Sequence, residues 1–353
     1  MKILFLTRFD QQGASSRMRA IQYLPWFEAA AIEYIVSPLF DDLMLLQKYR
    51  RGGYRSLDLL SAYWRRIYAL MRARRFDLVW IEKEALPWFP VWLERLLLCG
   101  KPYVLDFDDA IFHNYDLHHS AWVRRIYGQR IDRLMEGAKL VVAGNRYLAD
   151  RATTACAGRV EVIPTVVDLA RYAPKVNYLV TKRPRIVWIG SPSTAEYLLE
   201  LAMPLATLAK RQPFTLRVIG VGAITMQGVD VESLDWSAET EAALVAECDV
   251  GIMPLRDTPW EQGKCAYKLI QYMACGLPTV ASPIGANCDV VIEGKTGLFA
   301  DRVQSWVDAL AILLSDVGLR KCFGQAGRAR AEAEYSLQQI APRLIALLKN
   351  ATD

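Results

Sequence analysis

One stretch of the sequence, GKCAYKLIQYMACGLPTVASPIG (residues 263–285), combines two lysines and a glutamine in a pattern that could bind an anion. On a helix from residue 264 to 275, Lys264, Lys268 and Gln271 fall in one polar stripe, and apolar residues fill the opposite face. Cations are favoured at the C-terminal end of a helix, so lysines in its first two turns are best stabilised by an anionic ligand. The spacing alone fits a solvated amphipathic helix equally well.

A turn rich in hydroxyl groups follows the apolar segment RIVWI and precedes what we expect to be one long helix. A helix N-terminus with nearby hydroxyls can bind phosphate through its backbone N–H groups. A capped helix without a ligand is the commoner outcome, and neither G-x-G-x-x-G nor a P-loop is present. The candidate residues are Gly190, Ser191, Ser193 and Thr194.

The first apolar segment, KILFLT, leads into a second candidate loop, TRFDQQGASSRMR. Gly13, Ser15 and Ser16 would let the backbone come close to a ligand. Arg17 and Arg19 lie in the first helical turn, where positive charge opposes the helix dipole, so an anion is expected there.

A third group, in YVLDFDDA, places Asp106, Asp108 and Asp109 at the end of a predicted strand. Three carboxylates this close repel one another, so at least one should be hydrogen-bonded or have a raised pKa. Binding of hydroxyl groups and capping of the strand end both remain open. The D-x-D pattern also resembles the start of haloacid-dehalogenase-type phosphatases, although Ala110 occupies the usual Thr or Val position.

The elements that must position these residues alternate between short apolar runs and helix-length segments, which is typical of parallel sheets covered by helices. We expect an α/β fold with two Rossmann-like, doubly wound domains facing a central cleft. Ligands bind at the carboxyl ends of the strands in such sheets. The predicted strands are KILFLT, IEYIVS, DLVWIE, PYVLDF, KLVVAG and VEVIPT, then RIVWIG, TLRVIG, VDVESL, DVGIMPL, PTVASP and GLFA.

The domain boundaries follow from a break in this alternation. Residues 166–184 hold two prolines and show no periodicity, which predicts a linker. We expect domains at 1–165 and 185–335, with a C-terminal helix, 336–353, packing back on the first.

Composition excludes several classes of protein. The chain has 353 residues, 53% of them hydrophobic, and no apolar run approaches the roughly 20 residues of a membrane span. The start lacks a signal-peptide pattern, and the seven scattered cysteines predict reduced thiols, so we expect a cytoplasmic protein. Three histidines without cysteine neighbours give little support to a zinc site.

The net charge of +5 is unevenly distributed, because residues 48–75 carry nine basic side chains and one acidic one. This segment fits either a solvated basic face or contact with an anionic membrane surface, and a nucleic-acid partner is not expected.

The segment DVGIMPLRDTPWEQGKCAYKLIQYMACGLPTVASPIGANCDVVIEGKTGLFA resembles the C-terminal signature of the retaining, nucleotide-sugar-dependent group 1 (family 4) glycosyltransferases, which have the GT-B fold. VVAGNRYLADRA, VEVIPTVVDLARY and IVWIGSPST also resemble parts of that family. The family's two signature glutamates correspond here to Gly263 and Gln271, so the resemblance assigns Gln271 to the ribose, with Glu261 as a substitute for the first. No metal or cofactor is implied beyond the nucleotide-diphosphate sugar itself.

The resemblance implies further roles. Lys264 and Lys268, helped by Arg256 and the turn from Gly190 to Thr194, would stabilise the departing diphosphate, and Trp236 would lie near the nucleotide base. Asp108 and Asp109 would bind acceptor hydroxyls, and the loop from Gly13 to Arg19 would approach the donor phosphates and the acceptor.

We therefore expect a sugar to be transferred from a nucleotide sugar to a hydroxyl on a glycan or lipid-linked glycan, in cell-surface polysaccharide synthesis at the inner face of a membrane. The absence of both signature glutamates leaves open a catalytically silent nucleotide-sugar-binding protein. An NAD-dependent oxidoreductase is disfavoured because the glycine fingerprint and its acidic partner are missing.

Overall fold

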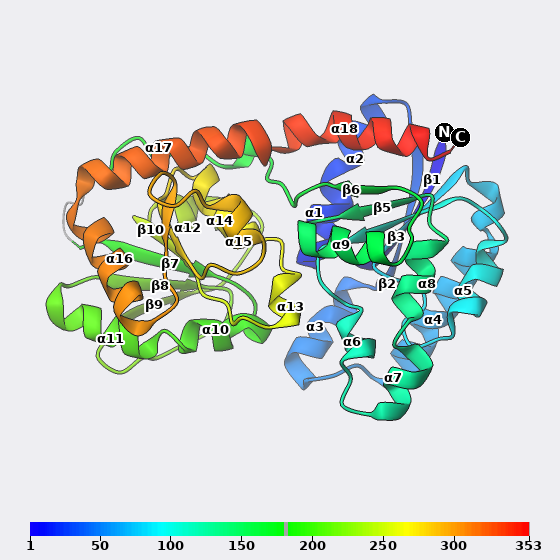
Figure 1. Cartoon of the computed structure of the whole chain (residues 1–353), viewed down its shortest axis with the longest axis horizontal. Coiled ribbons are helices and arrows are strands. Elements are labelled where there is room, and N and C mark those ends of the chain that lie inside the picture. The colour runs from blue at the N-terminus through cyan, green and yellow to red at the C-terminus, as the bar shows by residue number, and fades with distance from the viewer. Residues whose placement is uncertain (180–182, 353) are drawn as a thin grey trace. The chain divides into compact units, whose positions relative to one another are not determined.

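The computed structural model of the chain describes residues 1–179 and 183–352. The chain divides into two compact units, each built around one sheet (Figure 1). The first unit contains Met1–Thr165, Gln262–Cys265 and Ile340–Asp353, and the second contains Val166–Glu261 and Ala266–Gln339. The short return of residues 262–265 to the first unit departs from the prediction, which placed this segment in the second domain.

The first unit has a six-stranded, wholly parallel sheet with the order β2-β1-β3-β4-β5-β6. All six predicted strands are confirmed. β3, β4 and β5 are buried on both faces, as expected for a parallel sheet covered by helices. The strands are β1 (Lys2–Phe9), β2 (Glu33–Phe40), β3 (Leu78–Glu82), β4 (Tyr103–Phe107), β5 (Leu140–Ala143) and β6 (Val160–Val162).

Helices connect these strands. They are α1 (Ala14–Arg19), α2 (Leu24–Ala29), α3 (Asp42–Arg51), α4 (Ser56–Met71), α5 (Val91–Leu98), α6 (His113–Asp116), α7 (Ala121–Tyr127), α8 (Arg130–Glu136) and α9 (Arg146–Thr154), with 3₁₀ turns η1 (Ile21–Tyr23) and η2 (Ala73–Arg75).

The second unit repeats the architecture with the parallel order β12-β11-β10-β7-β8-β9, and its six predicted strands are also confirmed. Alternate residues of β7 show that both faces of the sheet are buried: Ile186 and Trp188 pack into one apolar cluster, and Val187 and Ile189 pack into another. The strands are β7 (Arg185–Ile189), β8 (Thr215–Ile219), β9 (Asp230–Leu234), β10 (Val250–Met253), β11 (Thr279–Ala281) and β12 (Gly297–Phe299).

Two predictions about the helices of the second unit are wrong. The long helix expected after β7 is broken into a 3₁₀ turn and two helices, and the helix expected from residue 264 starts only at Tyr267. The elements are η3 (Leu169–Arg171), η4 (Pro192–Thr194), α10 (Ala195–Leu199), α11 (Ala202–Arg211), α12 (Glu241–Ala246), α13 (Pro259–Gln262), α14 (Tyr267–Ala274), α15 (Ala286–Val290), α16 (Val303–Ser315), α17 (Val317–Glu334) and α18 (Leu337–Asn350), the last of which crosses the division between the units at residue 340.

The segment predicted as a linker is largely packed into the second unit. Val167 and Tyr172 are buried in one of its apolar clusters, and Tyr178 donates a hydrogen bond to the carbonyl of Gly276. Residues 180–182 of this segment, and residue 353 of the predicted C-terminal helix, lie outside the described residues. The end of α18 packs in the first unit, where Arg343 forms an ion pair with Glu161.

Among the described helices, none combines the length and the apolar character needed to cross a membrane.

Candidate active site

The strand orders place a topological switch point in each sheet, and ligands of doubly wound folds bind beside the carboxyl ends of the strands at such points. In the first sheet, β1 has β2 on one side and β3 on the other. In the second, β7 lies between β8 and β10. The loops that follow these strands carry most of the residues predicted to bind ligands.

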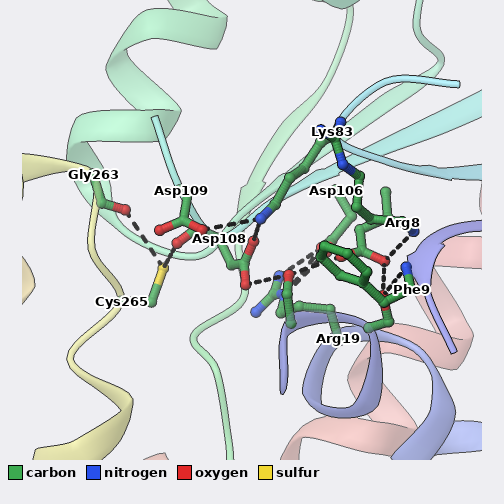
Figure 2. A network of polar contacts seen from close by, with 12 residues as sticks. Arg8, Phe9, Arg19, Lys83, Asp106, Asp108, Asp109, Gly263 and Cys265 are labelled. Atoms are coloured by element: carbon green, nitrogen blue, oxygen red, sulfur yellow. Dashed lines mark hydrogen bonds and ion pairs between the residues drawn. The ribbon is translucent and has the colours of Figure 1, made fainter. Parts of the chain in front are cut away.

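A charged cluster occupies the carboxyl ends of β1, β3 and β4 in the first unit (Figure 2). Lys83, the residue after β3, has a positive φ of 65° and is 6% exposed. Its Nζ lies 2.9 Å from Oδ1 of Asp108 and 3.0 Å from Oδ2 of Asp109. Burial would lower the pKa of Lys83, but the neighbouring carboxylates outweigh burial and raise it. The two aspartates are therefore held by a buried cation.

Asp109 is contacted by a second cation, because Nζ of Lys264 lies 3.0 Å from its Oδ1. Burial would raise the pKa of Asp109, but Lys83 and Lys264 outweigh burial and lower it to about 2. Asp109 is thus ionised at neutral pH and is a hydrogen-bond acceptor and a weak base. Its side chain keeps 24% of its surface exposed, so a hydroxyl group can reach it.

Asp106 is the carboxylate with a raised pKa. It is fully buried, and burial raises its pKa to about 6 although Arg19 opposes that rise. The guanidinium of Arg19 donates to both carboxylate oxygens and to the carbonyl of Ile163. The anion expected beside Arg19 is therefore an internal carboxylate, and Arg19, only 3% exposed, is a structural residue and does not reach a ligand.

Glu82, the last residue of β3, organises the loop after β1. Its carboxylate accepts hydrogen bonds from the hydroxyls of Ser15 (2.8 Å) and Ser16 (2.5 Å) and from the backbone N–H of Arg8 (2.8 Å). The hydroxyl of Ser15 also lies 2.6 Å from Oδ2 of Asp108. Gly13 packs closely on Phe9, because a Cβ atom added to Gly13 would lie 2.2 Å from Cβ of Phe9. The two serines therefore join the loop to the charged cluster. Arg17, on the same helix, donates to the carbonyl of Gln11.

The segment from residue 262 to 265 packs beside the charged cluster because the amide of Asn145 donates to the carbonyls of Gln262 and Lys264. A Cβ atom on Gly263 would lie 2.5 Å from Cβ of Ala110 and 2.7 Å from its backbone nitrogen. A glutamate at position 263 would therefore not fit without a shift of Ala110. The buried thiol of Cys265, whose pKa is raised by burial, donates to the carbonyl of Asp108 at 3.1 Å.

Lys264 therefore lies on a loop of the first unit, and the prediction of a helical stripe with Lys268 is wrong. The chain turns at Ala266, which has a positive φ of 52°, and α14 begins only after that turn. Lys268, by contrast, does lie in the first turn of α14, close to where the sequence placed it.

In the second unit, Lys268 lies beside the turn that follows β7. Its Nζ is 4.4 Å from the ring centroid of Trp188, the penultimate residue of β7. A Cβ atom on Gly190 would meet the same indole ring at 2.3 Å and the hydroxyl of Thr194 at 2.7 Å. Thr194 accepts from the backbone N–H of Ser191, and the hydroxyls of Ser191 and Ser193 are 2.9 Å apart. The indole therefore brings Lys268 and this hydroxyl-rich turn to the same edge of the sheet.

The predicted polar stripe placed Gln271 at the surface, and this prediction is wrong. It is 2% exposed, and its amide donates to the hydroxyl of Tyr172 at 2.9 Å. That hydroxyl donates to Glu241, which also accepts from the indole N–H of Trp236 at 2.7 Å. Gln271 and Trp236, predicted to contact the ribose and the base, thus belong to one polar network of the second unit.

Two other predicted residues have protein partners. Arg256 forms ion pairs with Glu196 and Glu200. Glu261, considered as a substitute for the missing glutamate, is buried and accepts from the hydroxyls of Tyr197 and Thr258.

Sequence reasoning missed Glu82, Lys83 and Glu241. A signal for the first two was available: EKE directly follows the apolar run LVWI, and three charges at the end of a buried strand are unusual unless they serve a site. Glu241 gives no comparable signal, because it looks like an ordinary residue in the first turn of a helix.

Two doubly wound units of this kind, each with polar residues at the carboxyl edge of its sheet, define the GT-B class of glycosyltransferases. Residues 14–166 match the family model for the glycosyl transferase 4-like domain, and residues 183–316 match the model for glycosyl transferases group 1. The chain belongs to the group 1 glycosyltransferase family.

Curated relatives include a GDP-mannose-dependent α-(1-6)-phosphatidylinositol monomannoside mannosyltransferase from Mycolicibacterium smegmatis, 29% identical over 61% of this chain and 63% of the relative. A D-inositol 3-phosphate glycosyltransferase from Pseudarthrobacter chlorophenolicus is 26% identical over 59% of this chain and 55% of its own length. The matched region thus spans somewhat over half the length of these relatives.

Among solved structures, HepE from Anabaena in complex with UDP-glucose is similar in fold. It superposes with a TM-score of 0.73 at 17% sequence identity, covering 99% of this chain and all of the other. At this identity the likeness concerns the fold.

Proposed function

We propose that the protein transfers a sugar from a nucleoside-diphosphate sugar to a hydroxyl acceptor with retention of anomeric configuration. The observation that carries the proposal is the position of Lys268 over Trp188, beside the turn from Gly190 to Thr194 and at the switch point of the second sheet. A cation and several hydroxyls at this edge suit a diphosphate. The names of the relatives support the class of donor, since one uses GDP-mannose and HepE was solved with UDP-glucose.

In this proposal Lys268 stabilises the negative charge that develops on the departing diphosphate. A charged group that is already in place gains most when charge appears in the transition state, because no reorganisation is then needed. Lys268 lies in the first turn of α14, where positive charge opposes the helix dipole, and the negative charge of a bound diphosphate would stabilise it there.

Asp109 is assigned to the acceptor. Lys83 and Lys264 keep it ionised, so it accepts a hydrogen bond from the attacking hydroxyl and orients it, and its low pKa makes it a poor general base. Asp108, hydrogen-bonded to Ser15, would orient a second hydroxyl of the same acceptor.

The acceptor itself is proposed to be a glycan or a lipid-linked glycan at an anionic membrane surface, in polysaccharide synthesis. The support is the segment 48–75, in which every basic residue except Arg66 is exposed or partly exposed. Arg66 is 1% exposed and donates to the carbonyls of Thr7 and Ser37, so it contributes nothing to that surface.

The donor is tested by thermal denaturation of the chain in the presence of UDP, GDP, ADP, TDP and their common sugar conjugates. A ligand at 100 times its Kd adds about 2.7 kcal/mol to the free energy of unfolding, so binding raises Tm clearly. A rise with one base names the donor, and NMR of the product anomer then tests retention. No rise with any nucleotide would overturn the proposal.

A catalytically silent nucleotide-sugar-binding protein is the second candidate, favoured by one observation: Gly263 cannot be replaced by a larger residue without moving Ala110, so the signature glutamate is excluded there. This alternative predicts a rise in Tm with a nucleotide sugar but neither transfer nor hydrolysis of that sugar in the presence of lipid-linked and free glycan acceptors.

A further inference from the structure

Trp88, on the loop between β3 and α5, combines an exposed side chain with a constrained backbone. It is 47% exposed, and its φ of 66° lies in the left-handed region that bulky residues rarely adopt. Among the described residues other than glycine, it is the only aromatic residue with a positive φ. Such a conformation persists only where the surrounding structure holds it, and its presence at an exposed position points to a function.

Buried hydrogen bonds hold the backbone of Trp88 in this conformation. Its N–H donates to the hydroxyl of Tyr115 at 3.2 Å, and that hydroxyl donates to Oε2 of Glu84 at 2.7 Å. The same oxygen of Glu84 lies 3.2 Å from Nε of Arg130. Tyr115, Glu84 and Arg130 are all buried. The interior of the unit therefore fixes the backbone, while the indole itself stays in contact with solvent.

Three rings border the indole, and each meets it at a steep angle. The ring centroid of Trp88 lies 4.9 Å from that of Tyr115, 5.9 Å from that of His118 and 6.3 Å from that of Tyr127, with interplanar angles of 64°, 77° and 75°. Edge-to-face contacts of this kind are favourable and orient the rings. The indole is therefore an exposed plane with a set orientation, unlike Trp64, which projects from the regular backbone of α4.

Trp88 and His118 also offer two N–H donors. Nδ1 of His118 accepts from the backbone N–H of Ser120 at 3.1 Å, so in the neutral imidazole the proton is on Nε2. Neither that Nε2 atom nor Nε1 of Trp88 has a hydrogen-bond partner in the part of the chain that the structure describes. The carbonyl of His118 accepts from Arg124 at 2.6 Å, which fixes the loop that carries the imidazole. Both donors are therefore available to a ligand.

An exposed indole with N–H donors beside it suits a sugar ring. A pyranose has C–H groups, which carry small positive charges, on its faces and hydroxyl groups around its edge. The face of an indole is apolar and negative, so it attracts the C–H groups, and the N–H donors pair with hydroxyl oxygens. Sites for small molecules commonly combine aromatic surface with a few polar groups that fix orientation.

Two segments of the chain, 83–88 and 108–118, form both the charged cluster and the surroundings of the indole. Their first residues are joined by the ion pair of Lys83, and their last residues are the two rings with the free N–H donors. Between these contacts, Glu84 accepts the hydrogen bond from Tyr115. Six residues span at most about 18 Å from the first Cα to the last. A ligand of more than one sugar unit can therefore contact the charged cluster and the indole together.

We propose that Trp88 and His118 bind a sugar unit of the acceptor other than the unit whose hydroxyl is attacked, so that the protein selects acceptors of at least two sugar units. This inference rests on the proposed function and deepens it, because it names the acceptor class as an oligosaccharide and assigns its recognition to residues outside the charged cluster. The two side chains bind the acceptor and take no part in the bond that forms or breaks.

The first test is binding of glycans to the full chain without nucleotide sugar. The probes are an array of defined mono-, di- and trisaccharides of glucose, galactose, mannose and N-acetylglucosamine, with affinities then measured by titration calorimetry. We expect at least one di- or trisaccharide to bind at least 10-fold more tightly than its component monosaccharides. Binding of none of these glycans, or equal binding of the monosaccharides, would overturn the proposal.

Variants of Trp88 test the indole. Trp88→Gly removes the ring without adding strain, because glycine adopts a positive φ readily, and it should weaken binding of the selected glycan at least 10-fold. Trp88→Tyr keeps an aromatic face and should stay within about 3-fold of the unchanged protein. The matched control is Trp64→Ala, which removes a tryptophan that is 72% exposed on α4 and should leave binding unchanged. Full binding by Trp88→Gly, or an equal loss in Trp64→Ala, would contradict the assignment.

Variants of His118 test the N–H donor. His118→Ala should weaken glycan binding about 5-fold, because a hydroxyl of the sugar loses its donor. His118→Gln, whose amide supplies an N–H group, should recover part of that loss. If both variants bind as the unchanged protein does, His118 is not part of the site.

Folding and donor binding are followed in the same variants. The substituted side chains are exposed or partly exposed, so Tm should stay within about 3 °C, and the rise in Tm with the nucleotide sugar should be unchanged. In transfer assays, Trp88→Gly should raise KM for the glycan at least 10-fold and leave KM for the nucleotide sugar unchanged. A chain that binds glycans through Trp88 but no nucleotide sugar keeps the carbohydrate site and loses the proposed function. A chain that binds the nucleotide sugar but no glycan keeps the proposed function and loses this inference.

Discussion

The Nζ atom of Lys264 lies 3.0 Å from Oδ1 of Asp109, although 155 residues separate the two in sequence. Asp109 follows β4, and Lys264 lies on the short segment that returns to the first unit just before α14. Together with Lys83, this pairing sets the charge state of the candidate acceptor-binding carboxylate.

The pair can be measured by a double-mutant cycle with Asp109→Asn, Lys264→Met and the double variant. The two side chains keep 24% and 23% of their surface exposed, so solvent screens part of their attraction. We expect a coupling free energy of about 1 kcal/mol in urea unfolding. Single effects that add to within about 0.3 kcal/mol would show that the ion pair contributes nothing.

The low pKa of Asp109 predicts how its contribution depends on pH. The group titrates near its ordinary value of 3.8 in the unfolded chain and near 2 in the folded one, so the unfolded state takes up its proton first as pH falls. The stabilisation is therefore complete above about pH 4 and is lost as pH falls toward 2. The difference in urea midpoint between the unchanged protein and Asp109→Asn should shrink across that interval, and a constant difference would contradict the lowered pKa.

Lys268→Ala is expected to lower kcat by about 10²-fold or more, because the change removes charge stabilisation that develops in the transition state. Lys210→Ala, which removes an exposed lysine of α11 in the same unit, is the matched control and should leave kcat unchanged. The kcat values of both variants and of the unchanged protein are measured by steady-state kinetics, with the donor that thermal denaturation identifies. An equal kcat in Lys268→Ala would remove this residue from the mechanism.

Gly263→Ala should lower the free energy of unfolding by about 1 to 3 kcal/mol, the usual cost of forcing extra atoms into a filled site. The added Cβ would lie 2.5 Å from Cβ of Ala110 and 2.7 Å from its backbone nitrogen, which cannot rotate away. Gly53→Ala is the control, since its Cβ would meet nothing within 4 Å. For the same reason Gly263→Glu is not expected to raise activity, and a more active, equally stable variant would refute this explanation.

The strands were predictable because each signal is local. A run such as LVWI or RIVWI, bounded by polar residues, is sufficient to predict a buried strand, and the alternation with helix-length segments predicts the parallel sheets. The helix starting at residue 264 was mispredicted because helical spacing does not reveal a backbone turn such as that at Ala266, which has a positive φ. The same error placed Gln271 at the surface, whereas α14 is buried on almost every side.

The assignment of Arg19 shows a second limit of local reasoning. The prediction placed Arg19 in the first turn of a helix, but Arg19 is the last residue of α1, so the helix dipole is not the reason for an anion beside it. The anion is Asp106, which lies 87 residues away, and the sequence cannot tell it from a bound phosphate. Only the packing of α1 beside the end of β4 decides this, and it changes Arg19 from a ligand-binding residue into a structural one.

By itself the sequence determined the fold class, the twelve strands and the family, because hydrophobic periodicity and local signatures are properties of neighbouring residues. Only the tertiary structure decided which charged side chains form ion pairs. Lys83, Asp109 and Lys264 come from three separate segments, and their protonation depends on burial and on distances of about 3 Å between those segments. Such distances are set by how the strands and loops pack, and no local pattern of residues encodes them.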